Sequence, residues 1–300
     1  MPKVFDIDEA DTCELGDCIA AIAQNGFEPS DDTSSHNAAR WLRKLGNNRA
    51  FLGDLLIRQL ESGYRDHVVE SGYGPQAILL GPVENGIFLR ANIWPAAQDH
   101  CFQASGAQTF VYDVPHDHNF SFLTVGYLGP GYQSDYYEYC YEEVAGYAGE
   151  PCDLRFVERS ALHEGKVMLY RAHRDIHSQI PPESLSVSVN VMKVDTAQSW
   201  YDQYGFDLEN RSVEKVLSPN STEVFLRVAV ATGHEGALDL AEQFARSHPS
   251  DRLRLASFEA RSLLREGRGA RDELWREAEM SGARMLTEVA KQRRAELERA

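Results

Sequence analysis

The pattern of hydrophobic and polar residues changes twice along this 300-residue chain. In residues 34–64, apolar side chains recur at spacings of three and four, which is typical of amphipathic helices. They are Trp41, Leu42, Leu45, Leu52, Leu55, Leu56 and Leu60. Ser34 or Ser35 is a candidate helix cap, and the sequence GNN interrupts the pattern. We therefore predict two short helices packed on a sheet, within an N-terminal helical region over residues 1–74.

From residue 75 to about 195, short β-rich segments alternate with Gly, Pro and Asp turns at roughly ten-residue spacing. The segments read QAILLGP, GIFLRANIWP, QTFVYDVPH, FSFLTVGYLGPG, SDYYEYCYEEV, CDLRFVER, GKVMLYRA and SLSVSVNVM. No helical pattern separates them, so a parallel sheet with crossover helices is disfavoured. This pattern of short β-rich segments predicts an antiparallel sandwich or barrel over residues 75–200.

Residues 220–300 return to helical periodicity, in four amphipathic segments separated by Gly or Pro signals. The last of these runs from Ala270 to the end of the chain as ARDELWREAEMSGARMLTEVAKQRRAELERA. No clear repeat period is visible. We expect a C-terminal helical region over residues 201–300 that serves in packing or dimerisation, or as a surface for a partner.

Composition narrows the class of protein. The formal charge of −16 repels phosphate backbones, so we expect no nucleic-acid partner. No apolar run approaches 18 residues, and the acidic start lacks a signal-peptide core, so we expect neither a membrane span nor secretion by that route. Five cysteines without CxxC spacing indicate reduced thiols. We therefore expect a cytoplasmic protein.

The first candidate functional residues lie in the sequence PHDH, residues 115–118. Strand alternation would place His116 and His118 on one face, about 7 Å apart, with Asp117 on the other. Two imidazoles so placed can reach one metal ion. Phe120, Phe122 and Thr124 would continue the same face as an aromatic wall. The alternative is that both histidines are merely polar positions at a strand end.

A metal needs a third ligand from elsewhere in the chain. Gly165 opens the strand KVMLYRA, a turn follows, and His173 and His177 precede the returning strand SLSVSVNV. If the segments that carry them are neighbouring antiparallel strands, His177 could lie close to His116 and His118. Glu138, in SDYYEYCYEE, is a possible fourth ligand. The alternative is that its side chain lies on a solvated face of the strand.

These residues resemble the cupin superfamily. His116 and His118 match the HxH of its first motif, and Gly126 roughly matches the later glycine. Gly165, 12 residues before His177, matches the second motif, with an asparagine on the returning strand. The stretch GKVMLYRAHRDIHSQIPPESLSVSVNV also looks like the second half of JmjC-like iron oxygenases. The resemblance covers roughly residues 85–195.

The resemblance implies an α+β fold: an antiparallel double-stranded β-helix, the cupin or jelly-roll barrel, flanked by N-terminal helices and a C-terminal helical region. It also implies that His177 is the third ligand. His173 is the runner-up, because an HR pair at the ligand also occurs in thiol dioxygenases. The glutamate of the first motif is missing, since Phe122 and Leu123 stand there. A three-histidine site remains, as in cysteine-dioxygenase-like cupins.

By this resemblance the metal is Fe(II), although imidazoles also suit other divalent transition metals. We expect a non-haem iron oxygenase that acts with O2 on a small polar substrate, either an amino acid derivative or a peptide side chain. A 2-oxoglutarate-dependent variant stays open, with a basic residue for the cosubstrate. The candidates are Arg90, Arg155, Arg171 and Arg174. The alternatives are a non-catalytic metal- or ligand-binding cupin with a helical interaction module, and a metal-dependent isomerase or lyase.

The segment that follows the HxH pair is rich in tyrosine: seven of the chain's thirteen lie between residues 127 and 147. Tyrosine combines apolar area with a hydroxyl, which suits a pocket wall. Tyr137 and Tyr139 share one face by alternation and are our catalytic candidates, together with Arg171. The alternative explanation of these many tyrosines is ordinary β-propensity in a strand at an exposed edge. A homodimer is a further possibility.

Overall fold

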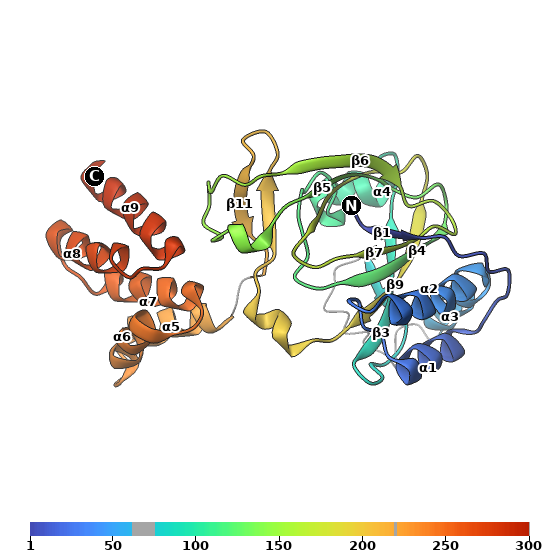
Figure 1. Ribbon diagram of the computed structural model, residues 1–300, viewed down its shortest axis with the longest axis horizontal. Helices are drawn as coiled ribbons and strands as arrows, with labels where there is room; N and C mark the ends of the chain where they lie inside the picture. The colour runs from blue at the N-terminus through green and yellow to red at the C-terminus, as the bar shows by residue number, and fades with distance from the viewer. Residues whose placement is uncertain (62–75, 219–220, 300) are drawn as a thin grey trace. The chain divides into compact units, whose positions relative to one another are not determined.

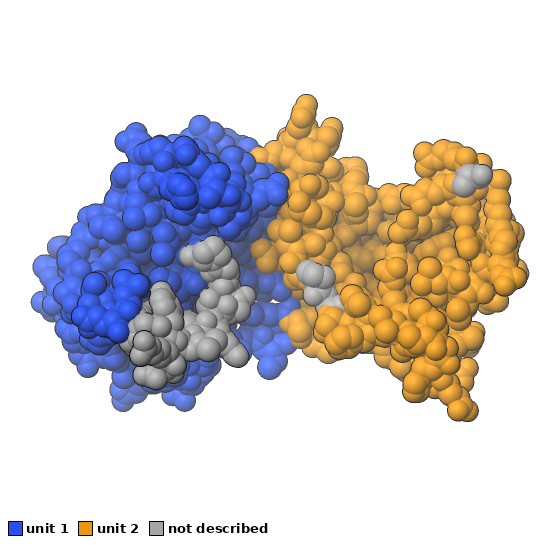
Figure 2. All heavy atoms as spheres, turned by 180° about the vertical axis from the view of Figure 1, so that it is seen from behind, with its two compact units in different colours: residues 1–141, 153–198 blue, residues 142–152, 199–300 orange. Residues whose placement is uncertain are grey.

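The computed structural model describes residues 1–61, 76–218 and 221–299. It divides into two compact units, residues 1–141 with 153–198 and residues 142–152 with 199–300 (Figure 2). Each unit is described by itself. The boundary that we expect at residue 74 lies outside the described residues, and the three ranges 1–74, 75–200 and 201–300 stay a prediction.

The first unit contains a six-stranded antiparallel sheet of order β1-β7-β4-β9-β3-β2. Its strands are β1 (Lys3–Phe5), β7 (Val167–Tyr170), β4 (Phe122–Leu128), β9 (Ser186–Lys193), β3 (Ile87–Trp94) and β2 (Ala77–Leu79). Strands distant in sequence are neighbours, because β9 lies between β4 and β3. The antiparallel arrangement expected from the sequence is confirmed.

One face of this sheet is covered by three helices, α1 (Leu15–Asn25), α2 (Asp32–Asn47) and α3 (Phe51–Glu61) (Figure 1). The residues of β9 that alternate towards them are Val187, Val189 and Val191. They share one buried cluster with Leu42 and Leu45 of α2. Each fully buried aliphatic side chain contributes about 1.5–3 kcal/mol of transfer free energy, so this face anchors the helices.

The two helices predicted between residues 34 and 64 are present, with a different cap. The carboxylate of Asp31 accepts from the Ser34 backbone N–H at 2.7 Å, so α2 begins three residues earlier than Ser35. The side chain of Asn48 accepts from the N–H groups of Ala50 and Phe51, which starts α3. The GNN sequence therefore ends one helix and caps the next.

A second antiparallel sheet, of order β6-β5-β8, faces the other side. Its strands are β5 (Gln133–Glu138), β6 (Arg155–Ala161) and β8 (Asp175–Ile180). An aromatic core joins the facing sheets, with Tyr136 on the three-stranded sheet and Trp94, Phe122 and Tyr170 on the six-stranded one. The result is a mixed α+β unit with two facing antiparallel sheets and helices on one outer side (Figure 1).

One predicted strand is wrong. The segment QTFVYDVPH follows α4 (His100–Ser105) and forms a short 3-10 helix over Ala107–Phe110 and then irregular chain. Val111 has φ 59° and Asp113 has φ 55°, both in the left-handed region, so the backbone cannot stay extended there. The sequence pattern also missed β8 as a strand of its own.

The second unit holds a hairpin and five helices within its described residues. They are β10 (Tyr204–Asp207), β11 (Ser212–Val216), α5 (Ser221–Ala231), α6 (Ala237–Ser247), α7 (Asp251–Leu263), α8 (Arg268–Glu279) and α9 (Arg284–Arg299). Short 3-10 turns over Tyr141–Glu143 and Thr196–Trp200 include two of the chain positions where one unit ends and the other begins. The last predicted helical segment is in fact two helices, because Gly282 at φ 78° breaks it. Among the described helices, none has the length and apolarity to span a bilayer.

Candidate metal centre

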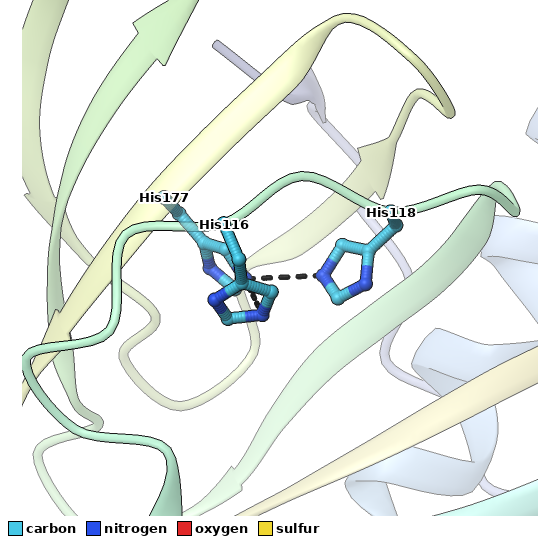
Figure 3. Close-up of side chains that lie close together, drawn as sticks. All are labelled: His116, His118 and His177. Atoms are coloured by element: carbon cyan, nitrogen blue, oxygen red, sulfur yellow. Dashed lines mark hydrogen bonds between the residues drawn. The ribbon is translucent and has the colours of Figure 1, made fainter. Parts of the chain in front are cut away.

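The HxH pair lies just before β4, in irregular chain, so the expectation that it sits within a regular strand is wrong. His116 nevertheless forms an isolated antiparallel bridge with His177 of β8. Each donates its backbone N–H to the other's carbonyl at 3.0 Å. Residues opposite one another in such a bridge project their side chains to the same side. His118 projects to meet them from two residues further along (Figure 3).

The three imidazoles converge through their Nε2 atoms. His177 Nε2 lies 3.2 Å from His116 Nε2 and 3.1 Å from His118 Nε2 (Figure 3). The ligand atoms of the group all lie within 4.8 Å of one another, and all three side chains are buried. The structure therefore brings together the three histidines that the sequence offered as metal ligands.

This donor set fits a metal ion. His177 Nε2 faces His116, His118 and the Gln179 amide nitrogen, at 3.3 Å, and one ring nitrogen can form a good hydrogen bond with only one of them. Metal–nitrogen bonds of about 2.0–2.1 Å would separate the ligand atoms by roughly 2.9–3.4 Å. The His116 Nδ1–H donates to the Val114 carbonyl at 2.7 Å, which leaves its Nε2 lone pair free for a metal.

Electrostatics keeps these imidazoles neutral. Burial lowers the pKa of His116, and its bond to Val114 offsets only part of that effect. Burial lowers the pKa of His118 still further, with added repulsion from the neighbouring histidines and Arg90. Burial and the charge of His116 also hold the pKa of His177 well below its usual range. Neutral imidazole is the form that binds metals.

A cavity of about 260 Å³ adjoins the three histidines. The six-stranded sheet supplies both polar and aromatic lining. The rest comes from the 3-10 segment and the residue after it, from β8, and from Gln76, Tyr132 and the HxH pair. The lining residues include Arg90, Asn92, Trp94, Val111, Phe122, Tyr132, Gln179, Ser188 and Asn190. A site with a few convergent polar groups on an aromatic wall is typical of small-molecule binding.

Aromatic rings surround the histidines, as expected from the sequence. The His118 ring centre lies 5.1 Å from that of Phe120 and 5.0 Å from that of Phe122. Behind them, the Tyr170 hydroxyl bonds those of Tyr136 at 2.9 Å and Tyr132 at 3.3 Å. Burial raises the pKa of Tyr136 to about 12 and that of Tyr132 beyond it, so both hydroxyls stay protonated.

Tyr132 lines the cavity; it is one of the seven tyrosines that the sequence offered as a pocket wall, but it was not among the catalytic candidates. Alternation along β5 correctly separates Tyr136 from Tyr137 but does not say which face looks inward. The structure places Tyr136 inside at 0% exposure, with Tyr137 packed edge-on against Phe156 at 5.3 Å. The signal available in the sequence was the position of Tyr132 at the end of the Gly/Pro loop.

The three catalytic candidates from the sequence do not line this cavity. Tyr137 packs on Phe156, as noted, and the Tyr139 hydroxyl donates to Asp117 Oδ2 at 2.5 Å. Arg171 pairs with Asp175 at 2.6 Å and with Glu138 at 2.8 Å. Their catalytic roles stay predictions.

The two alternative ligands lie apart from the group of three histidines. Glu138 accepts from Arg171, Arg155 and Arg174, and it is not among the clustered ligand atoms of the described residues. The His173 ring packs against Tyr141 with centroids 4.3 Å apart. The described residues therefore offer His177, and not His173, to the pair.

No family model matches this chain, and no curated protein matches it. Solved structures reported as DMSP lyases share 10% identity at a TM-score of 0.25, over 64% of this chain and 78% of theirs. The DMSP lyase of Ruegeria pomeroyi DSS-3 shares 11% at 0.26, over 65% and 79%. Prolyl 4-hydroxylases from Phytophthora capsici share 11% at 0.26, over 96% and 98%. At such TM-scores these likenesses carry no functional inference.

Proposed function

We propose that this chain is a metal-dependent enzyme of the cupin type, most specifically a mononuclear non-haem Fe(II) oxygenase. His116, His118 and His177 hold the metal, and a small polar substrate, an amino acid derivative or a peptide side chain, occupies the adjoining cavity. The observation that carries the proposal is the convergence of three buried, neutral imidazole Nε2 atoms at one cavity.

A divalent metal held by the three imidazoles would supply Lewis acidity and could bind substrate and O2. The chain's own residues supply the rest. The Val114 carbonyl orients the His116 ring, and the surrounding aromatic residues give the site an apolar wall. Tyr132 offers a protonated hydroxyl at the cavity, connected to Tyr170 behind it. That hydroxyl can donate a hydrogen bond to a bound anion.

Metal content and O2 consumption test the proposal. Protein purified without oxygen and loaded with Fe(II) should hold one metal per chain and consume O2 with a suitable substrate. His177→Ala should weaken metal binding by more than about 100-fold, because it removes a direct ligand. His173→Ala is the matched control, since its ring packs on Tyr141, and it should keep the metal.

The outcomes separate the alternatives. A wild-type protein that binds no transition metal overturns the proposal. A protein that binds metal through these histidines but consumes no O2 with any candidate substrate favours a metal-dependent lyase or isomerase, or a non-catalytic binding cupin. The hydroxyl chain Tyr132–Tyr170–Tyr136 gives the lyase or isomerase its support, because such reactions need proton donors at the substrate.

A further inference from the structure

Two cysteine thiols converge on one backbone carbonyl where α1 packs against α2 (Figure 1). The Cys18 Sγ atom, on α1, lies 3.5 Å from the carbonyl oxygen of Trp41 on α2. The Cys13 Sγ atom, from the chain just before α1, lies 3.8 Å from the same oxygen. The side chains of the two cysteines are also hydrogen-bonded to each other. The two sulfurs are therefore neighbours, and both are free thiols in this structure.

Each of these thiols is held in place by a different part of the chain. The Asn48 side-chain amide donates to the Cys13 carbonyl at 3.0 Å. Two residues earlier, the Asp11 carboxylate pairs with Lys44 of α2 at 3.1 Å. Cys18 is fixed separately, as a helical residue of α1. A disulfide forms only between cysteines that already lie close and face each other, and this arrangement meets that condition.

The two thiols differ in exposure and in acidity. Cys13 is half-buried, whereas Cys18 is 0% exposed. The hydrogen bond from Cys18 lowers the pKa of Cys13, and the charge of Lys44 adds to this effect. Burial and the charges of Asp17 and Glu14 oppose the lowering without cancelling it. The same hydrogen bond raises the pKa of Cys18, and burial raises it further. Cys13 is therefore the thiol that reacts as a thiolate, while Cys18 keeps its proton.

We propose that Cys13 and Cys18 form a redox-active pair, which a low-molecular-weight disulfide such as oxidised glutathione converts into a Cys13–Cys18 disulfide. The Cys13 thiolate attacks one sulfur of the oxidant, which forms a mixed disulfide and releases the other sulfur as a thiolate. Cys18 then loses its proton and attacks the Cys13 sulfur, which closes the internal disulfide and releases the second thiolate. In all, the two cysteine thiols lose two protons and two electrons, which convert one oxidant molecule into two thiols.

This pair stands apart from the three histidines. Neither cysteine is among the described residues that line the cavity. Cys18 belongs instead to the buried cluster that the N-terminal helices form with the other face of the six-stranded sheet. The proposal therefore goes beyond the proposed function and does not rest on it. The reduced thiols expected from the sequence are the resting form of the pair, and its spacing of five residues differs from CxxC.

Peptide mapping of the full chain tests the proposal. Trypsin releases residues 4–40 as one peptide that holds Cys13, Cys18 and no other cysteine. The chain is equilibrated with oxidised glutathione and about 0.1 mM reduced glutathione, quenched with acid and alkylated. An internal pair has an effective concentration of at least about 1 mM, so its ratio of oxidised to reduced form should exceed that of the exposed Cys101 by at least about tenfold. The peptide should be two hydrogens lighter, and cleavage after Glu14 should leave its halves joined.

Three variants assign the roles of the two thiols. Cys18→Ser should stop at the mixed disulfide, so that glutathione accumulates on Cys13. Cys13→Ser should leave Cys18 unmodified, because its thiol is buried. Cys101→Ser is the matched control and should close the Cys13–Cys18 disulfide as wild type does.

The wild-type map also gives the outcomes that overturn the inference. One is that both thiols of the peptide 4–40 stay free while Cys101 is oxidised. The other is that glutathione remains attached to Cys13 without closure of the internal disulfide. This wild-type result decides the matter if a variant does not fold.

Discussion

Asp117, between the two histidines of the HxH pair, gives the sharpest prediction. Its carboxylate is fully buried at 0% exposure, and it accepts a hydrogen bond from the Tyr139 hydroxyl at 2.5 Å. The change Tyr139→Phe removes that hydroxyl and keeps the ring, which is itself buried. We expect this bond to help hold the backbone of the segment that carries His116 and His118.

The expected loss of unfolding free energy follows from the kind of hydrogen bond that Tyr139 makes to Asp117. A hydrogen bond to a charged group contributes about 1.5–3 kcal/mol, and removing one partner leaves a buried acceptor less satisfied. We therefore expect Tyr139→Phe to lower the free energy of unfolding by about 2 kcal/mol. Residues that orient metal ligands typically change metal affinity by about 10- to 100-fold, so metal binding should weaken as well.

Denaturant unfolding and metal titration measure the two effects. Tyr137→Phe is the control, because Tyr137 lies two residues earlier, in β5, with its ring on Phe156, and it should stay within about 0.5 kcal/mol of wild type. A double-mutant cycle with Asp117→Asn isolates the pairwise interaction. If Tyr139→Phe behaves like Tyr137→Phe in both assays, the bond does not hold the segment and the reasoning is refuted.

Three further outcomes are expected. Gly126→Ala should lower the free energy of unfolding by about 3 kcal/mol, since an added Cβ would overlap the carbonyl of His163; an unchanged denaturation midpoint would contradict this. Burial raises the pKa of Asp202 to about 6, against the attraction of Arg252 and with added repulsion from Glu223. The folded state therefore holds this proton more tightly, and stability should rise by on the order of 2 kcal/mol as pH falls from 7 towards 4. In Asp202→Asn that rise should be smaller, and an identical pH profile would exclude the effect. Free metal at 100 times Kd should add about 2.7 kcal/mol to the unfolding free energy of metal-free protein, reversibly on chelation.

The sequence was informative wherever a local pattern determined the structure. The antiparallel strands followed from short β-rich segments without intervening helices, and His116, His118 and His177 meet as their spacing allowed. The pair meets His177 without being in a regular strand, because Val111 and Asp113 turn the backbone before it. A left-handed conformation at a valine has no reliable sequence signal.

The polar residues of β9 that line the cavity, Ser188 and Asn190, show what could not be predicted from the sequence. In SVSVNV the serines and the asparagine alternate with valines, a pattern normal for a strand with one face in water. Here that face is closed off, because the sheet formed by β5, β6 and β8 lies over it. Which face of a strand is covered depends on residues far along the chain. For the same reason alternation could not choose between Tyr136 and Tyr137.

The bridge between His116 and His177 also makes the metal affinity of the folded chain higher than that of the unfolded chain. These residues are 61 positions apart. In an unfolded chain a metal would have to close that loop itself, at an entropic cost of about 3.6 kcal/mol before any constant term. In the folded unit the two backbone hydrogen bonds have already closed it. A metal should therefore bind the native chain at least several hundred-fold more tightly than the unfolded one, which makes metal retention a measure of correct folding.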